Sequence, residues 1–448
     1  MRRAMFTDLY ALTMGAAYLL EGQADRKVTC ELFVRRLPRN RRFMVSAGLS
    51  DMLAALQEWE LTAADVEYLR QVPQLKGVLT APVLERLRRL SFQGDVWAMP
   101  EGTVFFPDEP VIRVTGSVLE AQLLETYLLS VFNHAASIAS KAARVMLAAA
   151  GKPVFEFGMR RVHPDASVTA SRVAFMMGLE ASSNVAAGQK DDLPLTGTMA
   201  HAFVMVHDHE EAAFRSFFKA YPKSPTFLVD TYDTLQGVQR AMAVAGPALG
   251  AVRLDSGDLA ELARGARRIL DQGGMPHVKI VASGDLDEHK VDALIKAKAP
   301  VDIFAVGTEL AASADAPTLG AVYKVVQDHS AGRGVAKFSA SKSTLAGVHQ
   351  VFRSVSAAGV MERDVIGLDD ERPAGMTGLL QPVMKDGRLL SRIPRLVDSR
   401  AHAAAELARL PPGLRDTSLA SFEPHAVTVS QTVKDVTEEA RRRFAAAM

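Results

Sequence analysis

Residues 251–258 read Ala-Val-Arg-Leu-Asp-Ser-Gly-Asp, a short and mainly apolar run that ends in a turn of acidic and small residues. The run Ala251–Leu254 is typical of a buried β-strand, and the helical pattern of Leu259–Leu270 follows the turn. A strand, a turn with Asp and Gly, and then a helix form the repeating unit of parallel α/β proteins. The stretch therefore predicts one βα unit of a parallel sheet.

The same arrangement occurs four more times along the middle of the chain. The other strand-like runs are Pro153–Phe157, Thr226–Val229, Lys279–Ala282 and Ile303–Val306. The residues that follow them are Gly158–Arg161, Asp230–Asp233, Ser283–Asp285 and Gly307–Thr308. One such turn would indicate only a helix cap, because caps favour Asp and Ser. Five in sequence predict an α/β barrel whose functional residues gather at the carboxyl ends of its strands.

Composition excludes several classes of protein. The chain has 448 residues, and 52 Lys and Arg against 51 Asp and Glu leave a net charge of +1, which argues against nucleic-acid and membrane partners. The single cysteine, Cys30, excludes an intrachain disulfide and a thiolate zinc site. We find no apolar run of roughly 20 residues that would span a membrane. We expect no signal peptide and a cytoplasmic protein.

Asp255 and Asp258 flank Gly257 at the end of the central strand. Two carboxylates at this spacing suit a Mg²⁺ ion shared with a phosphorylated ligand, or the stabilisation of a developing cation. Arg253 points to the same face of the strand as Asp255, so a buried structural ion pair fits the spacing equally well. Asp258, with Glu261 three residues later, also fits a helix cap.

Three further features indicate a binding site for anions. Two adjacent guanidinium groups at a strand end, Arg160-Arg161, favour anions. Gly307-Thr308 resembles a phosphate cradle of backbone N–H groups. His201 has small neighbours that would let a ligand approach, although a lone histidine is more often structural than catalytic. The segment His207–His209 predicts no metal site, because its two histidines face different sides of a helix.

Seven motifs, in order along nearly the whole chain, resemble those of nicotinate phosphoribosyltransferases. They are Phe6–Met14, Phe157–Arg161, Ser182–Gly188, Gly197–Phe203, Val229–Thr234, Arg253–Leu259 and Ser283–Asp285. The resemblance implies an α/β fold, with an irregular (β/α) barrel and a second α/β sandwich domain formed from both chain ends. We therefore expect an N-terminal α/β domain at 1–130 and a barrel with the phosphoribosyl site at 131–335. A C-terminal segment at 336–448 would pack back on the N-terminal domain.

The resemblance also implies an activity. The reaction joins nicotinate to phosphoribosyl pyrophosphate, with ATP and water, and gives nicotinate mononucleotide, pyrophosphate, ADP and phosphate by way of a phosphohistidine. Such an enzyme is an ATP-coupled ligase of NAD salvage. It uses Mg²⁺ as cofactor and ATP as co-substrate, and it forms a homodimer with shared active sites.

Site residues are carried over from the family motifs. His201 matches the histidine that is phosphorylated, and Asp255 is the second catalytic residue and an indirect Mg²⁺ ligand. The residues that match nicotinate contacts are Tyr10, Phe157, Asn184, Thr198 and Arg253. The residues that match phosphoribosyl and phosphate contacts are Arg160, Gly284, Asp285, Gly307 and Thr308. Tyr10, from the other subunit, and Phe157 would hold the pyridine ring between two aromatic faces.

Asn184 and Arg253 bear on the choice of pyridine. Related nicotinamide enzymes have an aspartate at the place of Asn184, and a carboxylate there would repel nicotinate. Arg253 would pair with the carboxylate of nicotinate. Two alternatives remain: a phosphoribosyltransferase for another pyridine, nicotinamide or quinolinate, and a catalytically idle homologue that binds a phosphate or a nucleotide.

Some positions depart from the family pattern. Ala312 stands where a threonine is usual, the stretch 337–347 lacks the usual proline before Gly347, and His349 replaces a lysine. These changes would weaken phosphate or ATP contacts. The arginine-rich loop 35–42 is expected to be a solvated turn, with an anion or a partner subunit as the alternative.

Overall fold

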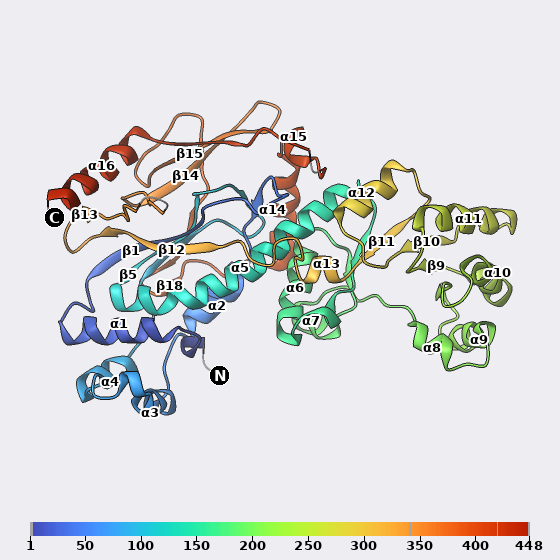
Figure 1. The fold of residues 1–448 in the computed structure, drawn as a ribbon, viewed down its shortest axis with the longest axis horizontal. Helices are drawn as coiled ribbons and strands as arrows, with labels where there is room; N and C mark the ends of the chain where they lie inside the picture. The colour runs from blue at the N-terminus through green and yellow to red at the C-terminus, as the bar shows by residue number, and fades with distance from the viewer. Residues whose placement is uncertain (1–2, 340–341, 419, 447–448) are drawn as a thin grey trace. The chain divides into compact units, whose positions relative to one another are not determined.

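The computed structural model describes residues 3–339, 342–418 and 420–446, and Figure 1 shows its elements. The chain forms two compact units. Unit 1 comprises Met1–Ser137, Thr318–Leu414 and Phe422–Met448, and unit 2 comprises Ile138–Pro317 and Arg415–Ser421. Unit 1 is thus built from both chain ends, as predicted. The three-segment division after residues 130 and 335 stays a prediction.

Unit 2 is built on a parallel sheet with the strand order β7-β6-β11-β10-β9-β8. Its strands are β6 (Val154–Glu156), β7 (Ala181–Ser182), β8 (Thr226–Leu228), β9 (Ala251–Leu254), β10 (Lys279–Ala282) and β11 (Ile303–Val306). Figure 1 shows β9, β10 and β11 side by side. The five predicted strands are confirmed. The sequence pattern missed β7, which at two residues is too short to show any alternation. The sheet is a curled partial barrel, so the predicted fold class is confirmed.

Helices alternate with the strands of unit 2. They are α6 (Pro164–Met176), α7 (Val185–Asp191), α8 (His201–Met205), α9 (Glu210–Ala220), α10 (Thr234–Ala245), α11 (Leu259–Gln272), α12 (Glu288–Lys296) and α13 (Thr308–Ala311). Aspartate side chains cap three of them, and each accepts a backbone N–H of the first turn: Asp233 for α10, Asp258 for α11 and Asp287 for α12. Asp258 is therefore a helix cap rather than half of a carboxylate pair.

One face of the parallel sheet carries small and apolar side chains. Ala251, Val281 and Ala305 are buried there, and Phe155 and Phe157 pack against them. Because side chains alternate along a strand, Arg253 points to the same face as Ala251. This face therefore leads from an apolar floor to polar groups at the carboxyl edge.

The described residues of unit 1 form three largely antiparallel sheets. A seven-stranded sheet runs β13 (Arg333–Gly334), β12 (Ala321–Asp328), β1 (Lys27–Val34), β5 (Pro110–Ser117), β3 (Asp95–Ala98), β17 (Gln381–Lys385) and β18 (Arg388–Leu389). A four-stranded sheet runs β16 (Thr377–Gly378), β14 (His349–Val355), β15 (Met361–Leu368) and β19 (Ala426–Val429), with β19 parallel to β15. A third sheet pairs β2 (Met44–Val45) with β4 (Val104–Phe105).

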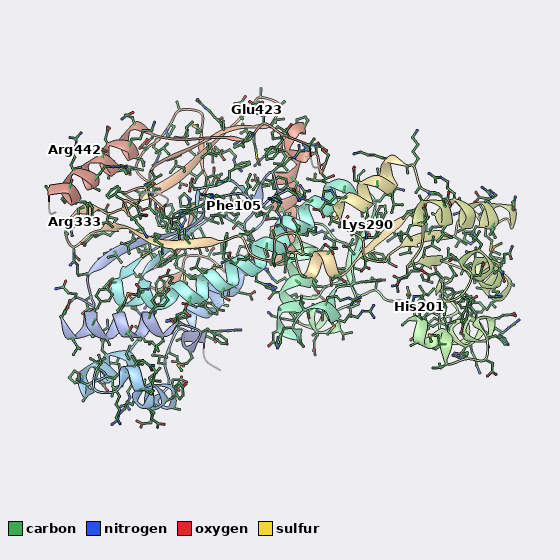
Figure 2. All side chains as sticks on the ribbon, viewed as in Figure 1. Phe105, His201, Lys290, Arg333, Glu423 and Arg442 are labelled. Atoms are coloured by element: carbon green, nitrogen blue, oxygen red, sulfur yellow. The ribbon has the colours of Figure 1, made fainter. Side chains whose placement is uncertain are left out.

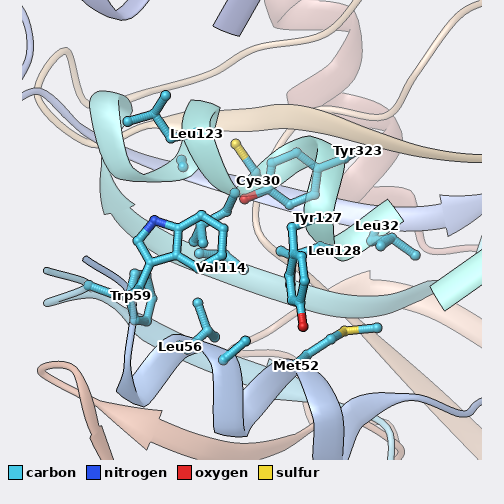
Figure 3. Close-up of a cluster of buried hydrophobic side chains, with 14 of the residues drawn as sticks. Cys30, Leu32, Met52, Leu56, Trp59, Val114, Leu123, Tyr127, Leu128 and Tyr323 are labelled. Atoms are coloured by element: carbon cyan, nitrogen blue, oxygen red, sulfur yellow. The ribbon is translucent and has the colours of Figure 1, made fainter. Parts of the chain in front are cut away.

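Helices and a large apolar core complete unit 1. The helices are α1 (Leu9–Leu20), α2 (Leu49–Gln57), α3 (Ala63–Gln71), α4 (Ala81–Arg88), α14 (Leu396–Ala408) and α16 (Gln431–Ala446). Two more helices, α5 (Val118–Ala148) and α15 (Pro412–Arg415), have residues in both units. Figure 3 shows part of the core, where the rings of Trp59 and Tyr127 lie 5.5 Å apart. Cys30 is buried in this cluster, and burial raises the pKa of its thiol to about 12. It is therefore an unreactive core residue.

The arginine-rich loop is only partly the solvated turn that we expected. Arg41 and Arg42 are buried, and Arg41 donates to the carbonyl of Ser137 over 2.7 Å. Arg42 donates to the carbonyl of Gly413 and lies over the ring of Phe422. The sequence could not show this, because both partners of Arg42 come from the far end of the chain.

No helix in the described part of the chain combines the length and the apolar character needed to cross a bilayer.

Candidate active site

A cavity of about 780 Å³ lies at the carboxyl edge of the parallel sheet in unit 2. The ends of β6, β9, β10 and β11 and the segment before α8 form its wall. Ten of the twelve predicted site residues line it: Phe157, Arg160, Thr198, His201, Arg253, Asp255, Gly284, Asp285, Gly307 and Thr308. The strand ends thus bring together residues that lie far apart in the sequence, while the role of each residue stays a prediction.

The other two predicted residues do not line this cavity. Tyr10 lies in the first turn of α1 in unit 1, where its ring is half exposed. Asn184 is fully buried in unit 2 and caps α7, with its side-chain oxygen accepting from the N–H of Ala187. Its amide nitrogen donates to the hydroxyls of Ser167 and Ser171. Asn184 therefore lies behind the wall of the cavity, and its effect on substrate choice stays a prediction.

Arg253 projects from β9 into the cavity. Its Nε donates to Ser283 over 2.8 Å, Nη1 to Thr198 over 3.3 Å and Nη2 to Asp255 over 2.7 Å. Its guanidinium carbon lies 5.5 Å from the centre of the Phe157 ring. A guanidinium has five N–H groups, so two remain for a ligand in the cavity.

Asp255 connects the cationic and the acidic parts of the wall. One carboxylate oxygen accepts from Arg253 and from the hydroxyl of Ser283, and the other lies 3.6 Å from Nε2 of His201. Burial by itself would raise the pKa of this carboxyl, but the hydrogen bond from Ser283 and the charge of Arg253 hold its pKa below the usual value. Asp255 is therefore a carboxylate at neutral pH and carries a fixed negative charge in the cavity.

His201 begins α8, near its label in Figure 2, and its partly exposed side chain lines the cavity. Its Nδ1 lies 3.1 Å from the hydroxyl of Thr231, and its Nε2 faces Asp255. A partner on each ring nitrogen fixes the orientation of the imidazole. Nε2 is the nitrogen that faces the charged part of the cavity.

Asp230 is a residue that the sequence interpretation placed at a strand end without giving it a role. It is buried, and one oxygen accepts from the N–H of Asp255 over 2.9 Å and from the hydroxyl of Ser256 over 2.7 Å. Asp230 thus holds the turn that carries Asp255. Its place after β8, the strand next to β9, was the signal in the sequence that could have indicated this role.

Two glycines let backbone segments approach closely at the cavity edge. Gly284 has φ +93°, and a Cβ there would lie 1.8 Å from the carbonyl oxygen of Asp255. A Cβ at Gly158 would lie 2.7 Å from the carbonyl oxygen of Gly307. Any larger residue would push these strand ends apart. Asp285, at φ +47°, also adopts the left-handed conformation, which is costly for a residue other than glycine and is frequent at functional sites.

The departures from the family pattern lie elsewhere. Ala312 ends α13 in unit 2. His349 is buried in unit 1, and its Nδ1 lies 2.7 Å from a carboxylate oxygen of Glu31. Lys337 and Thr344 close the 337–347 loop by two hydrogen bonds, while Ala340 and Ser341 lie outside the described residues. The predicted weakening of phosphate and ATP contacts stays a prediction.

Known proteins resemble this chain over nearly its full length. Residues 5–133 match the family model of the nicotinate phosphoribosyltransferase N-terminal domain, and residues 138–316 match that of the quinolinate phosphoribosyl transferase C-terminal domain. The nicotinate phosphoribosyltransferase pncB2 of Mycobacterium tuberculosis is 41% identical, over 99% of this chain and 94% of that protein. The human nicotinate phosphoribosyltransferase is 31% identical over 92% of each chain. This chain belongs to the nicotinate phosphoribosyltransferase family.

Solved structures agree with this membership. The crystal structure of human nicotinic acid phosphoribosyltransferase superposes with a TM-score of 0.85 and 29% identity. The match covers 97% of this chain and 99% of the human one. The nicotinate-nucleotide pyrophosphorylase of Pyrococcus furiosus has a TM-score of 0.75 and 26% identity, over 91% of this chain and 96% of that one. The family predicted from the seven motifs is confirmed.

Proposed function

We propose that this protein is a nicotinate phosphoribosyltransferase of NAD salvage. It joins nicotinate to phosphoribosyl pyrophosphate and couples the reaction to ATP hydrolysis. The observation that carries the proposal is the cavity in unit 2, whose wall combines Arg160, Arg253, Asp255 and His201 around an aromatic ring, Phe157. The full-length relatives that bear this name support it.

The pyridine binds against Phe157 and Arg253. The flat ring of nicotinate stacks on Phe157, and its carboxylate accepts from the two N–H groups of Arg253 that have no partner among the described residues. Thr198, already bonded to Arg253, adds a hydroxyl beside the carboxylate. Tyr10 would supply the second aromatic face from the other subunit of a homodimer with shared active sites.

Phosphoribosyl pyrophosphate binds at the strand ends. Arg160 and the Gly307-Thr308 turn contact its phosphates, and Gly284-Asp285 contacts the ribose side. The pyridine nitrogen attacks the anomeric carbon as the bond to pyrophosphate breaks. Positive charge develops on the sugar, and the carboxylate of Asp255 stabilises it electrostatically.

The residues present fit Mg²⁺ that is bound mainly through the ligand. No group of three or more His, Cys, Asp or Glu among the described residues could hold a metal ion. Asp255 and Asp285 nevertheless line the cavity with carboxylates, and Mg²⁺ is often bound by one or two carboxylates together with phosphate oxygens. When bound, Mg²⁺ would neutralise charge on the leaving pyrophosphate.

ATP acts through His201. Nε2 attacks the terminal phosphorus of ATP, so that an N–P bond forms, the P–O bond to ADP breaks, and water later releases phosphate. Thr231 engages Nδ1 and leaves Nε2 toward the cavity. We place these reactions in the cytoplasm, and the partners of the protein are its small-molecule substrates.

The test is product formation from phosphoribosyl pyrophosphate and Mg²⁺ with nicotinate or nicotinamide, each with and without ATP. Mononucleotide from nicotinate, increased by ATP with release of ADP, is the expected result. Product from nicotinate without any effect of ATP would refute the role of His201 in phosphoryl transfer. Product only from nicotinamide would refute the pairing of Arg253 with a carboxylate, and no product at all would favour an idle homologue.

Quinolinate is the second candidate substrate. The observation that favours it is the match of residues 138–316 to the quinolinate phosphoribosyl transferase C-terminal domain. A second carboxylate on the ring would need further cationic groups beside Arg253, and the cavity offers Arg160 and Arg161. Quinolinate as a third substrate in the same assay decides the matter, because its phosphoribosylation also releases carbon dioxide.

A further inference from the structure

Glu156 is a buried carboxylate directly behind the wall of the cavity. It is the last residue of β6, and only 1% of its surface is exposed. No lysine, arginine or histidine of the described chain forms an ion pair with it. A buried carboxylate without a cation costs several kcal/mol unless hydrogen bonds replace its water. The groups that donate hydrogen bonds to Glu156 in place of water therefore indicate which segments it holds in position.

Three donors reach Glu156 from two segments of the cavity wall and one helix. The N–H of Gly158, between the wall residues Phe157 and Met159, donates to Oε1. The hydroxyl of Ser182, next to the wall residue Ser183, donates to Oε2 over 2.6 Å. The hydroxyl of Ser171, on α6, donates to the same oxygen over 2.8 Å. One carboxylate thus connects the end of β6 with the end of β7.

The same connection extends to Asn184. Its amide nitrogen donates to Ser171 over 3.2 Å and to Ser167 over 3.1 Å, and its oxygen accepts from the N–H of Ala187 over 3.2 Å. The one proton of the Ser171 hydroxyl has two acceptors, Glu156 at 2.8 Å and the carbonyl of Ser167 at 3.0 Å, and the Ser171 oxygen accepts from Asn184. Both polar ends of the Asn184 side chain are therefore engaged inside the protein.

We propose that Glu156 is a positioning residue that selects the pyridine by holding Asn184 away from the cavity, an inference that rests on the proposed function. With Asn184 withdrawn, Arg253 is the group that meets the substituent on the ring, and it favours a carboxylate. Loss of the Glu156 bonds loosens Ser171 and with it the amide end of Asn184, which then depends on Ser167 and Ala187 alone. An Asn184 oxygen that leaves the Ala187 N–H can accept from the amide of nicotinamide. The preference for nicotinate then falls.

The test compares Glu156→Gln with a matched control. Glutamine keeps the shape but presents an NH₂ group where a carboxylate oxygen accepts. We expect the KM for nicotinate to rise about 10-fold, with kcat changed less than about threefold, because a bond to a charged acceptor is lost. The ratio of kcat/KM for nicotinate to that for nicotinamide falls by about as much. Ser171→Ala, a milder change, moves the ratio in the same direction.

The control is Glu288→Gln. Glu288 is as buried as Glu156 and lies in the same unit, but it pairs with Lys141 and Arg144 and does not line the cavity. Its replacement is expected to lower the melting temperature and to leave the substrate ratio unchanged. A ratio that moved equally in both variants would show a general loss of structure and would overturn the proposal.

Hydrogen exchange supplies a readout that does not need activity. Glu156→Gln is expected to speed amide exchange at 157–159 and 182–187, and Glu288→Gln is not. Unchanged exchange at both segments would overturn the positioning role, and this result does not depend on enzyme activity. Inactivity on every pyridine would be a separate result, and it would refute the proposed function. Faster exchange with an unchanged substrate ratio would overturn the role in selection.

Discussion

Arg253 in unit 2 and Arg353 in unit 1 both lie on strands beside aspartates, yet their surroundings differ. Arg353 is buried on β14 and donates to Asp364 over 2.7 Å and to Glu406 over 3.1 Å. The side chain of Arg253 is 15% exposed and lines a cavity. Two of its hydrogen bonds go to the neutral residues Ser283 and Thr198. Each arginine uses three of its five N–H groups, so the number of bonds does not separate them. Arg353 is structural because it is buried among its acids, and Arg253 is available for a ligand because it lines a cavity.

The largest effect is expected from Arg353→Met. The change removes the buried cation that Asp364 and Glu406 share and leaves only His425 beside Asp364 and the half-exposed Arg409 beside Glu406. Breaking a buried ion pair in this way costs about 3–5 kcal/mol of unfolding free energy. Urea unfolding measures the loss. The control is Arg363→Met on the exposed side of β15, which should cost less than about 0.5 kcal/mol. Similar losses in both variants would contradict the structural role of Arg353.

Arg253→Met should reverse this pattern. The kcat/KM for nicotinate is expected to fall roughly 100-fold, since a charge-assisted bond to the substrate is lost, while the unfolding free energy changes by less than about 1 kcal/mol. The kcat/KM for nicotinamide, which has no carboxylate, should fall less. Steady-state kinetics with both substrates, together with urea unfolding, check this expectation. A large loss of stability with an unchanged substrate preference would place Arg253 in the same class as Arg353.

His201→Ala tests the cavity at a second point. ATP stimulation should vanish, because Nε2 is removed, whereas the rate without ATP should stay within about threefold of the unaltered enzyme. His207→Ala is the control: His207 bonds the carbonyl of Phe203 over 2.8 Å and does not line the cavity. Release of ADP and of mononucleotide, measured together, separates the two variants. Persistent ATP stimulation in His201→Ala would exclude a phosphohistidine at this residue.

Much of the site could be predicted because parallel strands end at one edge. Each strand end was visible as an apolar run followed by Asp, Ser or Gly, so Arg253, Asp255, Gly284 and Gly307 were found from local pattern and family motif together. The same pattern could not sort the aspartates. Asp258 caps a helix, whereas Asp255 faces the cavity. The two lie three residues apart in one turn, and only the folded chain shows in which direction each side chain points.

The rest depended on contacts between distant segments. The burial of Asn184 follows from serines on α6, 13 and 17 residues earlier, whose hydroxyls carry no periodic signal. Arg353 gave no sign of burial, because its partner Glu406 lies 53 residues away on a helix. A hydrophobicity pattern predicts that polar residues are exposed to solvent. Buried networks of polar side chains are therefore what such patterns predict least well.

The smallest effect that we expect concerns Glu109, which lies beside Asp364. Burial, and then the charge of Asp364, raises the pKa of Glu109 well above its usual value, while the N–H of Phe106 donates to it over 2.8 Å. Between the unfolded pKa of 4.5 and the folded pKa, the folded protein binds more protons, so stability falls as the pH rises. Glutamine does not titrate and can still accept from Phe106.

Glu109→Gln should therefore gain stability relative to the unaltered protein as the pH rises from about 5 to about 7. Asp364 does not interfere, because the imidazole of His425 beside it and the hydrogen bonds and charge of Arg353 outweigh its burial and lower its pKa to about 2. The stability that it contributes is present above its unfolded pKa of 3.8 and is lost only as the pH falls toward 2. Urea unfolding at both pH values, with the exposed Glu362→Gln as control, measures the difference. An equal difference at pH 5 and pH 7 would mean that Glu109 is already ionised in the folded protein, which would contradict the raised pKa of its carboxyl.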